Sequence, residues 1–254
     1  MKILLMSMPD VAPVIMHESA LHMANNGLAS IAANIGNHHE VMIIDLIRKR
    51  RRVGRHVTKI LLKHRPDVIG FSSMTWQFHT CIKLLQLTKR LLPDAKTVIG
   101  GYHATLMNEE IADSPDAAWI DFMVRGEGEV AFPSLIDALE GDHHFEEIAS
   151  LSYKTDNGFH HNSRGELIDL SRIALPVRDR RRITSGYHAM NRKVEVLETS
   201  RGCTRSCNFC SMHHMYGRTY RTFPVDRVIA DIDVIYYRRH TRRIFISDDN
   251  MVLD

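Results

Sequence analysis

The chain contains the stretch Thr97-Val98-Ile99-Gly100-Gly101-Tyr102-His103-Ala104-Thr105, in which a short apolar run passes directly into two glycines. A brief β-branched run without regular polar alternation is typical of a strand that is buried on both faces. Glycines at its end allow the backbone to turn sharply into the next element. Four further apolar runs of similar length lie before and after it, at 3–6, 41–44, 68–71 and 122–124.

Helical patterns separate these runs. Apolar residues recur at helical spacing in residues 28–35, before Gly36, and in residues 82–92, before Pro93. Strands that alternate with helices predict an α/β fold built on a parallel sheet. We therefore expect residues 1–145 to form a doubly wound, flavodoxin-like domain.

The residues after the predicted strands form one rim, because the carboxyl ends of parallel strands meet at the same edge of a sheet. Gly100 and Gly101 follow one strand, and Ser72, Ser73 and Thr75 follow another. Glycines and small hydroxyl residues let a large ligand approach the backbone closely. The rim is therefore a candidate ligand site, although ordinary turn chemistry favours the same residue types.

Residues 146–190 lose the alternation and are predicted to be a hairpin linker. The stretches 148–155 and 159–162 flank Asp156-Asn157-Gly158, and an Asn-Gly pair is typical of a hairpin turn. The chain after Pro176 is polar and rich in arginine, as expected for a connecting segment.

A second strand–helix pattern begins near Lys193. It consists of a predicted strand at 194–198, a helix at 225–237 and a strand at 243–246. A complete (β/α) barrel runs to about 250 residues. We therefore expect residues 191–254 to be the start of a truncated partial barrel.

Composition excludes several classes of protein. The 254 residues carry 44% hydrophobic and 25% charged side chains, which is ordinary for a globular protein, and the net charge of +3 is too small to indicate nucleic-acid binding. No apolar run approaches the roughly 20 residues needed to cross a bilayer. Residues 1–6 lack the length and cleavage site of a signal peptide. We expect a cytoplasmic protein without a membrane span or a nucleic-acid partner.

Three of the four cysteines lie within eight residues, in Cys203-Thr204-Arg205-Ser206-Cys207-Asn208-Phe209-Cys210, whereas Cys81 stands alone. A tight cluster in a reducing compartment indicates a metal site rather than a disulfide framework. A loop with this spacing can place one thiolate on each of three irons of a [4Fe-4S] cluster, which leaves the fourth iron open. An open coordination position is typical of a catalytic centre.

Structural zinc is the alternative, with His213 or His214 as the fourth ligand of the three cysteines. Three features favour the cluster. The cysteines form one triplet instead of two separated pairs, the triplet follows a buried strand, and Phe209 places an apolar ring beside the last cysteine.

The stretch from Thr199 to Cys210 closely resembles the signature of radical S-adenosylmethionine (radical SAM) enzymes, CxxxCxΦC, in which Φ is aromatic. The resemblance implies that Cys203, Cys207 and Cys210 hold a [4Fe-4S] cluster and that its open iron chelates the methionine part of S-adenosylmethionine. It also implies that Phe209 packs near the adenine. An electron from a donor such as flavodoxin or ferredoxin then breaks the sulfonium bond, and the resulting 5′-deoxyadenosyl radical abstracts hydrogen from a small-molecule substrate.

The first half of the chain resembles the cobalamin-binding domain of one large subgroup of these enzymes. The resemblance is carried by the residues at 9–13, 16–17, 45, 100–105 and 126–129, in this order. It implies a cobalamin site made by Pro9, Ser72, Ser73, Thr75, Gly100, Gly101, Tyr102, His103, Gly126 and Glu127.

The motif Asp-x-His-x-x-Gly, whose histidine binds cobalt in many cobalamin proteins, does not occur in this sequence. The subgroup often lacks it too. His103 is therefore expected to be a rim residue near the corrin or its tail rather than a cobalt ligand.

The residues Asp248-Asp249-Asn250 follow the last predicted strand. In many radical SAM enzymes this place holds the methionine amino group, and carboxylates suit an ammonium. A helix N-cap explains the same residues equally well.

The resemblance implies methyl transfer to an unactivated carbon or phosphorus as the reaction. Oxidative cyclisation of the porphyrin type is the alternative within the enzyme class. Outside it, the chain would be a cobalamin-binding module with structural zinc, or a flavin or nucleotide protein with the same sheet.

Overall fold

The computed structural model describes residues 1–9, 21–47, 49, 52–141, 143–183, 187–189 and 192–251. Of the residues that carry the resemblance to cobalamin-binding domains, 10–13 and 16–17 lie outside the described residues. No helix in the described part of the chain is long and apolar enough to span a membrane.

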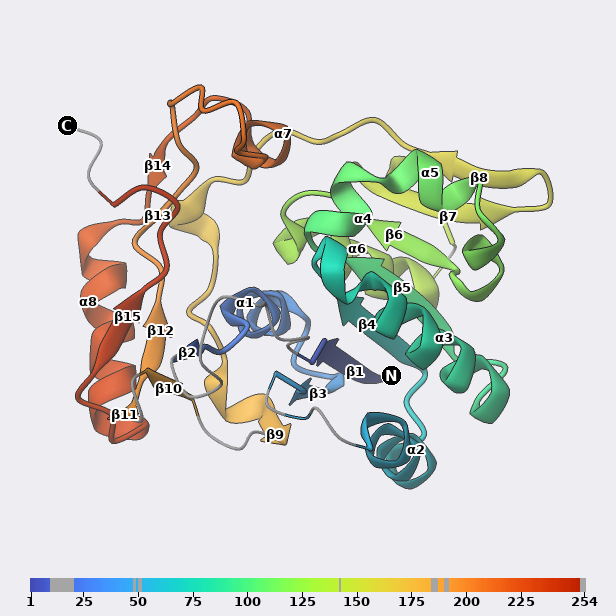
Figure 1. Ribbon diagram of the computed structural model, residues 1–254, viewed down its shortest axis with the longest axis horizontal. Helices are drawn as coiled ribbons and strands as arrows, with labels where there is room; N and C mark the ends of the chain where they lie inside the picture. The colour runs from blue at the N-terminus through green and yellow to red at the C-terminus, as the bar shows by residue number, and fades with distance from the viewer. Residues whose placement is uncertain are drawn as a thin grey trace.

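The centre of the molecule is an eight-stranded sheet with the order β8-β7-β6-β5-β4-β1-β3-β9 (Figure 1). Its neighbouring strands from β9 to β6 run parallel. The parallel strands are β1 (Lys2–Ser7), β3 (Glu40–Asp45), β4 (Val68–Ser72), β5 (Lys96–Gly100), β6 (Phe122–Val124) and β9 (Arg181–Ile183). The first five strands of this set have the flavodoxin-like order, which confirms the predicted doubly wound sheet.

Helices cover both faces of this sheet. Along β1, Ile3 and Leu5 pack with α1 (Asn26–Asn34) and α6 (Gly128–Glu140). Leu4 and Met6 point to the other face, where they pack with α2 (Val53–His64) and α3 (Phe78–Leu91). Successive side chains of a strand alternate between faces, so a continuously apolar strand requires this two-sided cover.

The segment that was predicted to be a linker contributes to both edges of the sheet. β7 (Leu151–Thr155) and β8 (Gly158–His161) form the predicted hairpin, and β7 adds to β6 in antiparallel orientation. The chain then crosses to the opposite edge, where β9 pairs with β3. Arg178, in this arginine-rich stretch, is 2% exposed because Asp231 and Glu195 pair with its guanidinium. These carboxylates make burial of the arginine possible, since an unpaired buried charge is costly.

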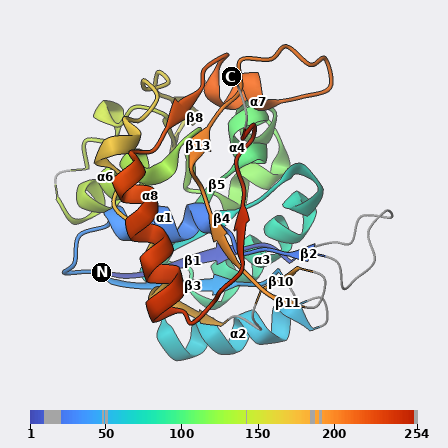
Figure 2. The same ribbon diagram turned by 90° about the vertical axis from the view of Figure 1, so that its left-hand side faces the viewer.

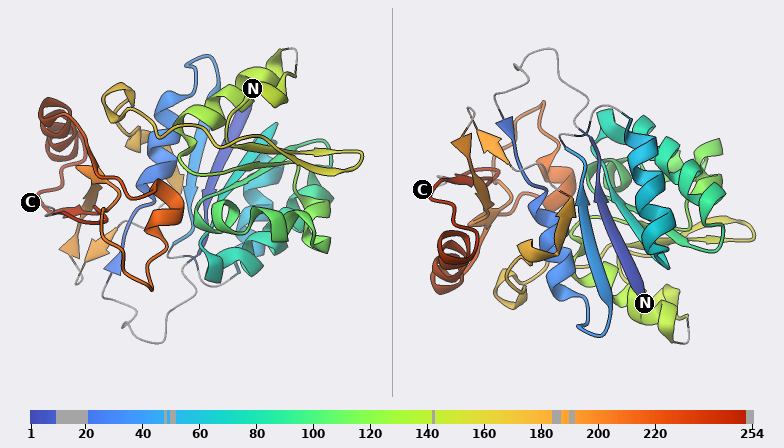
Figure 3. Two further views of the ribbon diagram at one scale, coloured as in Figure 1. Left: turned by 90° about the horizontal axis from the view of Figure 1, so that it is seen from above. Right: turned by 90° about the horizontal axis from the view of Figure 1, so that it is seen from below.

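The C-terminal elements lie together on one side of the α/β domain, as Figures 1 and 3 show. β12 (Glu195–Leu197) pairs in parallel with β15 (Ile244–Ile246), and β13 (Ser200–Arg201) pairs in antiparallel orientation with β14 (Arg221–Thr222). Figure 2 shows α8 (Val225–Asp233) in front of these strands, continued by one π-helical turn at Val234–Arg238. The predicted strand–helix–strand pattern is confirmed.

The shorter elements complete the fold. They are β2 (Leu21–His22), β10 (His188–Ala189), β11 (Arg192–Lys193), α4 (Tyr102–Leu106), α5 (Asn108–Ala112), α7 (Met212–Tyr216), and the 3-10 turns Thr75–Gln77, Pro115–Trp119, Phe145–Glu147, Leu170–Arg172 and Arg178–Arg180.

Candidate functional site

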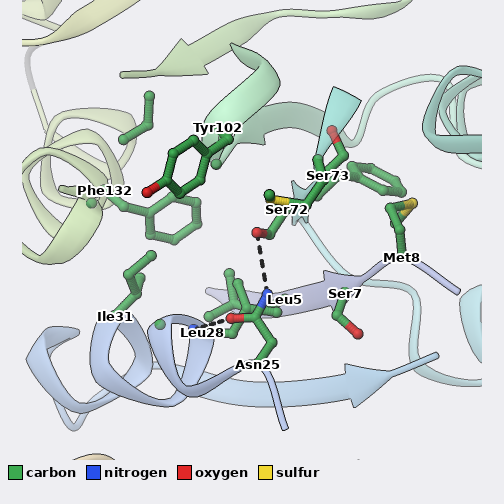
Figure 4. Close-up of a pocket in the computed structure, with 18 of the residues that line it drawn as sticks. Leu5, Ser7, Met8, Asn25, Leu28, Ile31, Ser72, Ser73, Tyr102 and Phe132 are labelled. Carbon is green, nitrogen blue, oxygen red and sulfur yellow. Dashed lines mark hydrogen bonds between the residues drawn. The ribbon is translucent and has the colours of Figure 1, made fainter. Parts of the chain in front are cut away.

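A cavity of about 500 Å³ opens at the carboxyl ends of the parallel strands, next to the point where β1 and β4 lie side by side. In a doubly wound sheet the strand order reverses at this point, which leaves a crevice for a ligand. Figure 4 shows side chains from β1, β4, α1, α4 and α6 around this space. The C-terminal part closes the cavity from its side with Glu198, Arg201, Met215 and Tyr216.

Seven of the ten residues predicted to bind cobalamin line this cavity: Ser72, Ser73, Gly100, Gly101, Tyr102, Gly126 and Glu127. Pro9, Thr75 and His103 do not belong to its lining. The His103 Nδ1 atom lies 3.3 Å from Thr75 Oγ1, and the ring of His103 contacts that of Phe78 at a tilt of 48°. Burial lowers the pKa of His103. These two residues therefore support the rim from behind.

Gly101 fixes the shape of the rim. Its φ is +89°, and a Cβ at this position would lie 3.0 Å from the backbone oxygen of Ser73. The amide of His103 donates a 3.3 Å hydrogen bond to this same oxygen. A side chain at position 101 would therefore push α4 away from the loop after β4, which is why the sequence needs glycine here.

Polar side chains organise the floor of the cavity. Asn25 caps α1 through Leu28 and also donates a 3.3 Å hydrogen bond from its Nδ2 to Ser72 Oγ (Figure 4). Asp45 accepts hydrogen bonds from Ser7 and from the hydroxyl of Tyr187. Asp45 carries part of the resemblance to cobalamin-binding domains, and in the structure it joins β1, β3 and the residue directly before β10.

The cysteine loop lies between β13 and α7. Cys207 is exposed, Cys203 and Cys210 are partly exposed, and the amide of Cys210 donates a 3.1 Å hydrogen bond to the carbonyl of Cys207. Gly202 starts the loop with φ +86°, where a Cβ would lie 2.4 Å from the backbone oxygen of Thr219. Phe209 stands in this loop and is 93% exposed, so its ring is free to cover a ligand.

The sulfur atoms of the loop do not have the close spacing of a tetrahedral zinc site. Tetrahedral zinc, with bonds of about 2.3 Å to sulfur, holds its thiolates about 3.8 Å apart. In the described chain, the sulfur atoms of Cys203, Cys207 and Cys210 do not all lie within 4.8 Å of one another, and neither His213 nor His214 forms such a group with two of them. A cubane cluster spaces its three thiolates more widely, because each sits on a different iron.

Asp248, Asp249 and Asn250 hold the cysteine loop and the strand before it. The carboxylate of Asp248 accepts hydrogen bonds from the amide and hydroxyl of Thr199 and from the hydroxyl of Ser200. Asp249 Oδ2 accepts a 3.0 Å bond from the amide of Gly202, and Asn250 Nδ2 lies 3.4 Å from Cys203 Sγ. Burial, together with the charge of Asp248, raises the pKa of Asp249. Sequence patterns did not indicate this role.

Tyr102 connects the two sites. It leaves the end of β5, lines the cavity, and donates a 2.6 Å hydrogen bond to the sulfur of Met212, two residues after Cys210. Burial raises its pKa, and the charges of Asp249 and Cys210 act in the same direction. The rim and the cysteine loop therefore meet in one place.

A buried ion network ties the two halves together, and sequence reasoning did not anticipate it. Arg201 donates to Glu127 at 2.8 Å, to Glu129 at 2.6 Å and to Glu198 at 3.0 Å, while Arg221 pairs with Glu127 from the other side. Burial favours a higher pKa for Glu127, but the hydrogen bonds from Arg221 and Arg201 outweigh it and hold the pKa below its usual value. Both stretches, 126–129 and 199–202, stand out in the sequence, but no sequence pattern indicates that their side chains form ion pairs.

Comparisons with known proteins indicate the family of this chain. Residues 12–136 match the B12 binding domain family. The chain is 30% identical over 229 residues to an uncharacterized methyltransferase of Pyrococcus horikoshii, with 90% of this chain and 49% of the relative covered. It is 27% identical over 230 residues to the anaerobic magnesium-protoporphyrin IX monomethyl ester cyclase of Rubrivivax gelatinosus, with 84% and 39% covered. The chain thus spans less than half the length of these relatives.

A solved structure shares the fold. The radical S-adenosylmethionine methyltransferase TsrM from Kitasatospora setae, with cobalamin and a [4Fe-4S] cluster bound, superposes with a TM-score of 0.74 at 16% identity. The superposition covers 98% of this chain and 48% of TsrM. It includes the parallel sheet and the elements around the cysteine loop alike.

Proposed function

The chain belongs to the family of cobalamin-binding radical S-adenosylmethionine proteins, and on that premise we propose that it is an enzyme that cleaves S-adenosylmethionine reductively and transfers a methyl group to an unactivated carbon or phosphorus. One observation carries the proposal. The rim residues and the residues on either side of the cysteine loop line the same cavity. A methyl carrier and a site of reductive cleavage must lie close together for such a reaction.

We assign cobalamin to the cavity, with its nucleotide tail against Gly100 and Gly101. Ligand pockets of about 300–1,000 Å³ are typical, and the absent Cβ atoms let a ligand approach the backbone. Ser72, Ser73 and Tyr102 supply hydroxyl groups to the same wall. The division at 1–145, 146–190 and 191–254 remains our proposal for the cobalamin-binding unit, its connection and the start of the radical SAM unit.

We assign a [4Fe-4S] cluster to Cys203, Cys207 and Cys210, and S-adenosylmethionine to the adjacent space. When bound, the cluster supplies the electron that breaks the sulfonium bond, and cobalamin carries the methyl group. Asn250 orients the Cys203 thiolate, and Asp248 fixes the strand that leads into the loop. Asp249 remains the candidate partner of the methionine ammonium, and Phe209 the cover of the adenine. A small-molecule substrate and a flavodoxin or ferredoxin as electron donor complete the proposal.

Anaerobic reconstitution tests the cluster. The protein should bind iron and sulfide in equal amounts and turn brown, and replacing Cys203, Cys207 or Cys210 with alanine should remove the iron. Cys81→Ala is the matched control, because Cys81 is fully buried and burial raises its thiol pKa to about 12. A colourless protein that binds one zinc ion would support the alternative of a cobalamin-binding module with structural zinc. A protein that retains flavin instead of a corrinoid would support the alternative of a flavin or nucleotide protein.

Product analysis tests the reaction. Incubation of the reconstituted, cobalamin-loaded protein with S-adenosylmethionine and reductant should yield S-adenosylhomocysteine, because that product forms only when the methyl group leaves. Formation of 5′-deoxyadenosine without S-adenosylhomocysteine would contradict methyl transfer. It would support oxidative cyclisation, the reaction named for the Rubrivivax gelatinosus relative.

A further inference from the structure

We propose that His38, His39 and Glu140 form a binding site for a divalent transition-metal ion of the zinc class. The site lies at the amino ends of the parallel strands, whereas the cavity lies at their carboxyl ends. Both histidines directly precede β3, and Glu140 is the last residue of α6. Among the described residues, these three make up the only group of three or more His, Cys, Asp or Glu side chains whose donor atoms all lie within 4.8 Å of one another.

The distances match a tetrahedral site. The His38 Nε2 atom lies 3.3 Å from Glu140 Oε2, and the His39 Nδ1 atom lies 3.4 Å from Glu140 Oε1. Zinc bonds of about 2.0–2.1 Å to nitrogen and oxygen place neighbouring donors about 3.3 Å apart. Each histidine donor therefore already lies at this distance from one oxygen of Glu140, and all three donors lie within 4.8 Å of one another. Two imidazoles with one carboxylate are a ligand set that this class of metal prefers.

Rigid elements hold the donors in place. The turn between α1 and β3 is fixed by the hydrogen bond from the His39 amide to the Gly36 carbonyl and by the bond from the Glu40 amide to the Met1 carbonyl. His38 and His39 are consecutive, but they present different ring nitrogens. The longer reach of Nε2 from His38 and the shorter reach of Nδ1 from His39 bring both atoms to the same carboxylate.

The Met1 amino group already contacts two of the three donors. It lies 3.2 Å from both Glu140 Oε1 and His39 Nδ1, which shows that these atoms converge on a cationic group. A bound metal ion would take the place of this ammonium group between them.

The test is a Zn²⁺ titration of the untagged, cluster-reconstituted protein, in which the loop cysteines are occupied by iron. Calorimetry should show one additional zinc equivalent, and the midpoint of thermal unfolding should rise by about 5 °C at saturating zinc. Glu140→Gln and His38→Ala should each weaken this binding at least tenfold, by analogy with the roughly 10–100-fold that lost supporting contacts cost metal sites. His38 is chosen because its side chain is 66% exposed, so its removal should leave the fold intact.

Glu146→Gln is the control. Glu146 pairs with His144 at 3.4 Å on the surface but has no third donor in the described chain within the same range. Its zinc binding should equal that of the native protein. Cobalt substitution adds a spectroscopic readout, because nitrogen and oxygen ligands give visible bands without the sulfur-to-cobalt charge transfer that thiolates show. Equal zinc binding by the native protein and Glu140→Gln would overturn the proposal, and the cluster assignment would be unaffected.

Discussion

The rim of the cavity and the cysteine loop lie next to each other, yet they are built in different ways. The rim rests on the ends of parallel strands, where Ser73 is 3% exposed and the other rim residues that line the cavity are partly buried. The loop stands in solvent, with Cys207 exposed and Phe209 93% exposed. The rim depends on backbone shape at Gly101, whereas the loop depends on polar contacts from Asp248, Asp249 and Asn250.

This difference separates a preformed site from one that its ligand completes. The strands of the sheet fix the rim without help from a bound group. The thiolates of the loop have few protein contacts of their own, so a cluster would order them. Damage to the rim at Gly101 should therefore weaken cobalamin binding alone, and damage to the loop contacts should weaken cluster binding alone. Damage to the ion network between them should affect both.

The largest effect is expected from Arg201→Met, which leaves Glu129 and Glu198 without the arginine that pairs with them, whereas Glu127 keeps Arg221. Breaking a buried ion pair on one side costs about 3–5 kcal/mol, because the remaining charge stays buried and unpaired. Urea unfolding should show this loss, and both cofactors should bind more weakly.

Arg172→Met is the matched control, because the Arg172 side chain is 85% exposed and its pair with Asp169 lies on the surface. It should change the free energy of unfolding by about 0.5 kcal/mol or less. Equal losses in the two variants would show that the network does not join the halves.

Gly101→Ala should break the rim and spare the loop. Alanine at φ +89° is strained by about 1–3 kcal/mol, and its Cβ would press on Ser73. Cobalamin affinity, followed by absorbance titration, should fall while the iron content stays unchanged. Gly158→Ala has a similar φ of +110° with no atom within 4 Å of the added Cβ, so it measures strain without the clash. If both variants bind cobalamin with equal affinity, the contact between the added Cβ at position 101 and Ser73 does not affect cobalamin binding.

Asp248→Asn should produce the opposite pattern. It weakens the hydrogen bonds that hold Thr199 and Ser200, each worth about 1.5–3 kcal/mol because the acceptor is charged. The cluster should be lost faster on exposure to a chelator, and cobalamin affinity should not change. Reduced cobalamin affinity would mean that the loop contacts also support the rim.

The smallest effect is a pH dependence at Glu127. Its folded-state pKa lies below the unfolded value, so its contribution to stability is present above about pH 4.5 and is lost as the pH falls through the folded pKa. Glu127→Gln should therefore lower the midpoint of thermal unfolding at pH 7, and this difference from the native protein should shrink below pH 4.5. If the difference in unfolding midpoint between the two proteins stays constant from pH 7 to pH 4, the lost stability comes from packing and not from the charge of Glu127.

The sequence was a good guide wherever a pattern is local. All five apolar runs of the first 145 residues became strands, and the Asn-Gly turn formed the predicted hairpin. The cysteine spacing defined the candidate metal loop. Local patterns failed at the arginine-rich stretch, where Arg178 is buried because distant carboxylates neutralise it.

The sequence alone thus determined the alternating strands and helices, the glycine rim and the triplet of thiols, because periodicity, turn chemistry and ligand spacing act between neighbouring residues. Only the tertiary structure decided that Tyr102 reaches Met212, that Arg201 joins Glu127 and Glu129, and that Asp248 holds Thr199. These contacts link residues about 50 to 110 positions apart. Their formation depends on how the two halves pack, which no short stretch of sequence encodes.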